Sequence, residues 1–175
     1  RRPSAFDGLM LVAPTVRLAE RVRLDPWWEA LLAWCEYLPL VRHLPLLRGT
    51  DLASLHYAQD AAWRLDEDRR LNALHYWGRL RPQTARSLLV ATDSIAAQLD
   101  NVTSPLLVLH GADDLTSAPD LSEELVRRAV SSDKTLQLVP SAMHGLHYGE
   151  SPETMRGVYQ TMFDWLDRRM LPRRR

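Results

Sequence analysis

The sequence has very little cysteine, no excess of charge of either sign and no long apolar run. Its single cysteine, Cys35, excludes an internal disulfide and is typical of a reducing compartment, so we expect a cytoplasmic location. Lys plus Arg and Asp plus Glu both number 22, a balance that gives no basic face for nucleic acid. The apolar stretches are short and interrupted by charge, so we expect no segment to span a bilayer.

Three short apolar runs are typical of buried parallel strands, at residues 9–13, 106–109 and 135–139. Apolar residues recur at helical spacing over residues 121–130, and a final helix is expected over residues 152–169. This order predicts an α/β fold. A buried strand so early in the sequence needs neighbours on both sides, and only later strands follow it. We therefore expect part of the sheet to lie outside this sequence.

Residues 15–102 separate the first two predicted strands and differ from them in composition. Asp25 and Pro26 form a good helix start, and that helix should end before Pro39. Further helices are expected around residues 51–65 and 84–99. The pattern predicts a mostly helical insert within a partial α/β domain that covers residues 1–175. Five of the six tryptophans fall in this insert, namely Trp27, Trp28, Trp34, Trp63 and Trp77.

Acidic and histidine residues follow two of the predicted strands. The second strand runs into Asp113 and Asp114, and the third runs into a loop that contains His144 and His147. Loops beyond the carboxyl ends of parallel strands gather at one rim of the sheet, so an acid and a histidine from these loops can meet. Such a pair serves a serine nucleophile, and the order serine, acid, histidine is that of α/β-hydrolases.

The sequence motifs around these residues resemble those of the monoacylglycerol lipase-like α/β-hydrolases, particularly the plant branch that includes the caffeoylshikimate esterases. The family belongs to the serine aminopeptidase-like hydrolases. The resemblance covers nearly the whole sequence and is carried by five stretches: Phe6-Asp7-Gly8 with Leu11-Val12-Ala13-Pro14, Leu109-His110-Gly111-Ala112-Asp113-Asp114, Ser131-Ser132-Asp133-Lys134-Thr135-Leu136, Met143-His144-Gly145-Leu146 with Tyr148-Gly149-Glu150, and Asn72, Tyr76, Gly78, Arg79 and Arg81 in the insert.

The resemblance implies a Ser-His-Asp triad and identifies two of its members. The acid is Asp114, with its neighbour Asp113 as the alternative, and the base is His144. His147 and His110 compete with His144, and we interpret His110 as structural. Two departures from the family pattern are a shortened stretch at residues 66–72 and Ser141, which stands where glycine is more usual.

The sequence contains no Gly-x-Ser-x-Gly elbow, the turn that exposes the serine in this fold. In the family this elbow lies shortly before the point that corresponds to Arg1. We therefore expect the serine upstream of this sequence, and we expect the chain by itself to be inactive. The alternative is a non-catalytic truncated remnant or a binding module.

The implied substrates are acylglycerols, lysolipids or phenolic esters, and no cofactor or metal is implied. The tryptophan-rich insert suits an apolar substrate group, although its tryptophans can also simply pack the cap. Trp27 and Trp28 are adjacent in a predicted helix and should not share a face. One of them could then contact lipid, so we expect peripheral contact with membranes. We interpret the arginines at residues 168–175 as a solvated tail.

Overall fold

The computed structural model describes residues 6–18, 20, 23–47, 63, 67, 70–74 and 78–170. Its sheet has three parallel strands in the order β1-β2-β3. Strand β1 spans Leu9–Val12, β2 spans Leu106–Gly111 and β3 spans Lys134–Val139. The three predicted strands are therefore confirmed, with ends that differ by one or two residues.

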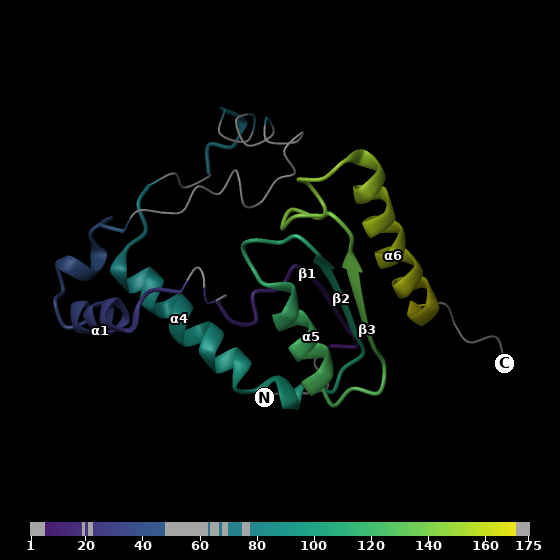
Figure 1. The fold of residues 1–175 in the computed structure, drawn as a ribbon, viewed down its shortest axis with the longest axis horizontal. Helices are drawn as coiled ribbons and strands as arrows, with labels where there is room; N and C mark the ends of the chain where they lie inside the picture. The colour runs from purple at the N-terminus through teal and green to yellow at the C-terminus, as the bar shows by residue number, and fades with distance from the viewer. Residues whose placement is uncertain are drawn as a thin grey trace.

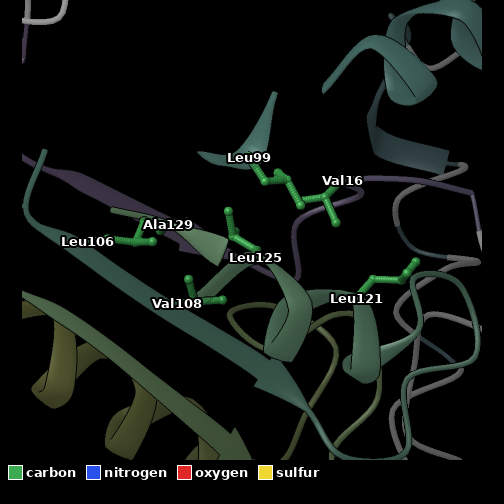
Figure 2. Packing of buried hydrophobic residues seen from close by; sticks show 7 residues of the cluster. All are labelled: Val16, Leu99, Leu106, Val108, Leu121, Leu125 and Ala129. Carbon is green, nitrogen blue, oxygen red and sulfur yellow. The ribbon is translucent and has the colours of Figure 1, made fainter. Parts of the chain in front are cut away.

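The central strand β2 is buried on both faces because a helix covers each side of the sheet. Helix α5 (Pro119–Arg128) lies on one face and α6 (Pro152–Met170) on the other, as Figure 1 shows. Alternate residues of β2 point to opposite faces. Leu106 and Val108 pack with Leu121 and Leu125 of α5 (Figure 2). This two-sided burial explains why β2 reads as a continuous apolar run.

The other face of β2 packs against α6. Leu107 and Leu109 form a second buried cluster with Val158 and Trp165 of that helix. Strand β3 is more exposed, which agrees with its more alternating sequence. Strand β1 pairs with β2 along its whole length, and within the described residues no other strand pairs with it.

The long connection from β1 to β2 contributes helices that lie beside the sheet (Figure 1). They include α1 (Pro26–Cys35), the short 3-10 helices η1 (Val41–His43) and η3 (Leu99–Asn101), and α4 (Pro82–Ala96). Leu32 of α1 packs against Ala85 and Leu89 of α4. The predicted helix at residues 51–65 and Trp77 lie outside the described residues, apart from Trp63.

Arg23 ties the start of this connection to both of its long helices. Its guanidinium donates to Glu29 at 2.7 Å and to Asp93 at 3.0 Å. The helix begins at Pro26 as expected, but Asp25 makes no capping hydrogen bond through its side chain. Within the described residues, no helix is both long and apolar enough to cross a bilayer.

The prediction that Trp27 and Trp28 occupy different faces was wrong. Their ring centroids lie 3.9 Å apart, and both side chains are exposed. Neighbouring helical residues point about 100° apart. An indole ring nevertheless extends far enough from its Cα for the two rings to meet across that angle. The paired rings do not pack into the interior of the connection.

Candidate active site

The two loops predicted to carry the acid and the histidine meet at the carboxyl edge of the sheet. The amide of Ala112, just after β2, donates to the carbonyl oxygen of Val139 at the end of β3 at 2.9 Å. The amide of Asp113 donates to the carbonyl oxygen of Ala142 at 3.0 Å. These hydrogen bonds hold the acid loop and the histidine loop together.

Asp114 and His144 contact each other at this edge. The Oδ2 atom of Asp114 lies 2.8 Å from Nδ1 of His144. The Asp114 residue is only 2% exposed, whereas the His144 side chain keeps 19% of its surface accessible. With the acid on Nδ1, the other ring nitrogen, Nε2, is the one that can exchange a proton with a reacting group.

The sequence left three alternatives open, namely Asp113 as the acid and His147 or His110 as the base. Asp113 is exposed, and it was the competing acid. His147 was a competing base, and it is exposed as well. The partial burial that remains lowers the pKa of His147, and the charge of nearby His144 lowers it further. His110 does contact Asp114, but it is fully buried and cannot reach a substrate.

The Asp114 carboxylate accepts hydrogen bonds at both oxygens. Oδ1 accepts the backbone amides of Thr116 at 2.7 Å and Ser117 at 3.1 Å. Oδ2 accepts the Ser117 hydroxyl at 2.9 Å and His110 Nε2 at 3.0 Å, in addition to His144. The backbone turn that follows Asp114 therefore solvates a carboxylate from which water is almost excluded.

Two opposing effects set the pKa of Asp114. Burial disfavours the charged form and by itself raises the pKa. Hydrogen bonds from His110 and His144, the charge of His144 and the amide of Thr116 all lower it. The balance holds the pKa of Asp114 well below the usual range of an aspartate. The carboxylate of Asp114 is therefore ionised at neutral pH.

The histidine loop is held in a strained backbone conformation. Ser141 adopts φ 56°, in the left-handed region that favours glycine, which accounts for the family's preference at that position. The buried carboxylate of Glu150 accepts the Met143 amide at 2.6 Å. Together these features orient the residue before His144.

Gly111 allows the two loops to approach each other. A Cβ atom at this position would lie 2.3 Å from the carbonyl oxygens of both Ala142 and Met143. No side chain fits such a space, so the glycine that ends β2 is required by the histidine loop.

Ser117 is a site residue that the sequence reasoning missed. Its hydroxyl lies 2.9 Å from Asp114 Oδ2 and 3.2 Å from His144 Nδ1. It does not occupy the position of a nucleophile, because it is fully buried and lies on the acid's side of the imidazole. A serine three residues after the acid was the only signal available. Among the described residues, no cluster of three or more potential ligands could hold a metal ion.

The chain is similar to known hydrolases in sequence and in structure. The family described as "Serine aminopeptidase, S33" matches residues 1–152. A caffeoylshikimate esterase from Arabidopsis thaliana is 33% identical over 99 residues, which are 57% of this chain and 30% of that protein.

Solved structures share the fold. A monoacylglycerol lipase from Paleococcus ferrophilus superposes with a TM-score of 0.76 at 19% identity, covering 96% of this chain and 61% of that one. A soluble variant of the monoglyceride lipase from Saccharomyces cerevisiae, in complex with a substrate analog, gives a TM-score of 0.73 at 20% identity. That match covers 98% of this chain and 56% of the yeast chain. The chain therefore spans less than two thirds of the length of these relatives.

Proposed function

Since this chain belongs to the family of serine aminopeptidase S33 hydrolases, we propose that it supplies the acid and the base of an ester hydrolase. Asp114 is the acid and His144 is the base. The observation that carries the proposal is the 2.8 Å contact between Asp114 Oδ2 and His144 Nδ1 at the rim where the loops after β2 and β3 meet.

In this mechanism a serine hydroxyl attacks the ester carbonyl while Nε2 of His144 removes its proton. The ionised Asp114 stabilises the imidazolium that forms and keeps the proton on Nδ1. His144 then gives its proton to the leaving alcohol, and an acyl-enzyme remains. Water attacks the acyl-enzyme with His144 again as the base, which releases the acid product and restores the serine.

The serine of this triad lies outside the sequence described here. The chain contains no Gly-x-Ser-x-Gly elbow, and Ser117 is buried on the wrong side of His144. We propose that an upstream segment supplies the elbow. That segment also supplies the backbone amide after the serine, one of the donors that stabilise the tetrahedral intermediate. The chain alone is then inactive.

Labelling with a fluorophosphonate probe tests this division of the triad. The 175-residue chain should not react, whereas a form extended upstream to include the elbow should become labelled at the elbow serine. Labelling of the short chain contradicts the proposal. If the upstream sequence encodes no elbow and an extended form does not react, the alternative of a non-catalytic remnant or binding module is correct.

We propose that the substrates are acylglycerols, lysolipids or phenolic esters. The relatives named above include a caffeoylshikimate esterase and monoacylglycerol lipases. The helical insert of residues 15–102 acts as a cap over the site, and its apolar side chains suit an acyl or aromatic group.

We propose that the chain acts in the cytoplasm and contacts membranes through the exposed apolar face of this insert. Trp27 is 58% exposed and Trp34 is 69% exposed, and Tyr37 and Leu40 are more exposed still. Indole rings favour the boundary between water and lipid because one end of the ring is polar.

Co-sedimentation with phosphatidylcholine vesicles tests this contact. Replacing Trp27 and Trp28 together by alanine should lower the bound fraction at least about tenfold, because each indole buries a large apolar area. Phe163→Ala is the matched control, since Phe163 is 57% exposed but lies on α6, which covers the face of the sheet opposite α5. Equal binding of the double variant and the original chain contradicts the proposal.

A further inference from the structure

A second histidine reaches the carboxylate of Asp114 from inside the protein. His110 lies near the end of β2 and is fully buried. Its Nε2 atom is 3.0 Å from Asp114 Oδ2 and 2.9 Å from the carbonyl oxygen of Ser117. Both neighbours can only accept hydrogen bonds. Nε2 of His110 therefore carries a proton and donates it to the carboxylate.

The other edge of the His110 ring is anchored on a different element. Its Nδ1 atom lies 2.6 Å from the Ser122 hydroxyl, which belongs to α5 and is fully buried. A ring with partners at both nitrogens cannot rotate or flip without losing a hydrogen bond in a site closed to water. The direction of the Nε2–H bond is thus set jointly by β2 and α5.

The two histidines that contact Asp114 lie on different kinds of element. His144 lies on a loop and is partly accessible, whereas His110 lies in the central strand. A reacting imidazole needs a fixed partner, because small errors in geometry at a catalytic pair greatly reduce the rate. Asp114 can be that partner only if groups other than His144 fix its orientation. The backbone amides of Thr116 and Ser117 hold Oδ1. His110 and the Ser117 hydroxyl hold Oδ2, the oxygen that contacts His144.

We propose that His110 is a positioning residue that locks the Asp114 carboxylate in the orientation from which it holds His144. The inference rests on the proposed roles of Asp114 and His144. His110 links the Asp114 carboxylate to β2 and α5, and so fixes it for the loop that carries His144. Its hydrogen bond also contributes to the lowered pKa of Asp114.

Nuclear magnetic resonance of the histidine rings in the full chain tests the proposal without any ester turnover. The nitrogen shifts of the unsubstituted chain should show a protonated Nε2 in His110. The proton on Nδ1 of His144 should exchange slowly with water, because Asp114 holds it. An unprotonated Nε2 in His110 overturns the proposal, and this result does not depend on any variant folding.

Three variants then separate positioning from general stability. His110→Leu removes the donor, and the His144 ring proton should exchange at least about tenfold faster, as expected for the loss of a hydrogen bond to a charged group. His110→Gln restores an N–H donor and should keep the exchange within about threefold of the original. Ser131→Ala removes a different buried hydroxyl, remote from the site, and should leave the exchange unchanged.

Unchanged exchange in the leucine variant overturns the proposal. So does a glutamine variant that loses protection as fully as the leucine variant, because a purely structural role would not depend on the donor. None of these measurements uses ester hydrolysis. Failure of the proposed positioning role of His110 therefore remains distinguishable from failure of the ester hydrolase proposal.

Discussion

At the scale of single residues, Asp114 carries a negative charge at a position from which water is almost excluded. Five hydrogen bonds from His110, His144, Thr116 and Ser117 take the place of that water. The sequence placed two adjacent carboxylates after β2 but could not decide between them by spacing alone. The backbone turn directs Asp114 inward, into contact with His144, and leaves Asp113 exposed.

Replacing Asp114 by asparagine should destabilise the chain by about 3 kcal/mol near pH 7, because it leaves buried donors without their charged partner. The folded-state pKa of Asp114 is lowered. Its ionised form therefore stabilises the fold above the ordinary aspartate pKa of about 4, and this contribution is lost as the pH falls through the folded-state value.

Thermal unfolding across a pH series measures this effect. The gap in unfolding temperature between the original chain and Asp114→Asn should be widest near pH 7 and should narrow below about pH 4. Asp113→Asn is the adjacent, exposed control and should leave the profile unchanged. A gap that stays constant with pH would show that the charge of Asp114 does not stabilise the fold.

At the scale of elements, the site depends on how closely the end of β2 approaches the histidine loop. The sequence predicted both loops, because apolar runs fix where the strands end. It could not predict the contacts of His110 or Ser117, which arise only when β2, α5 and the acid loop meet in space. The pairing of Trp27 with Trp28 was missed because helical periodicity describes side-chain directions and not side-chain reach.

Gly111→Ala should destabilise the chain by roughly 1–3 kcal/mol, because the added methyl group would collide with two carbonyl oxygens of the histidine loop. Gly157→Ala is the matched control. Its Cβ would meet nothing within 4 Å, and Gly157 lies inside α6, where alanine is favoured by roughly 0.5–1 kcal/mol. Denaturant unfolding of both variants measures the two changes in the free energy of unfolding, which should have opposite signs. Equal destabilisation by the two changes would contradict the tight loop contact.

At the scale of the whole molecule, one edge of the sheet is apolar and lacks a paired strand among the described residues. Strand β1 carries only apolar side chains, Leu9, Met10, Leu11 and Val12. Its pairing with β2 occupies one of its two edges, and no described strand pairs with the other edge. An open apolar edge of this kind promotes association with other chains. The apolar sequence of this first strand, which only later strands can flank, is also why we expect further strands outside this sequence.

Light scattering tests this expectation. The 175-residue chain should self-associate as its concentration rises, whereas a form extended upstream by a strand that pairs with β1 should remain monomeric. A short chain that stays monomeric at the same concentrations would show that the edge of β1 needs no partner.

The central claim is that Asp114 and His144 form the acid–base pair of an ester hydrolase. The most direct measurement is kcat/KM for a monoacylglycerol in the form that carries the elbow serine. His144→Ala should lower kcat/KM by at least about 10⁴, as expected when a triad member is lost. His147→Ala, in the same loop, should stay within about tenfold of the original. Loss of activity in the His147 variant with activity kept in the His144 variant would contradict the account.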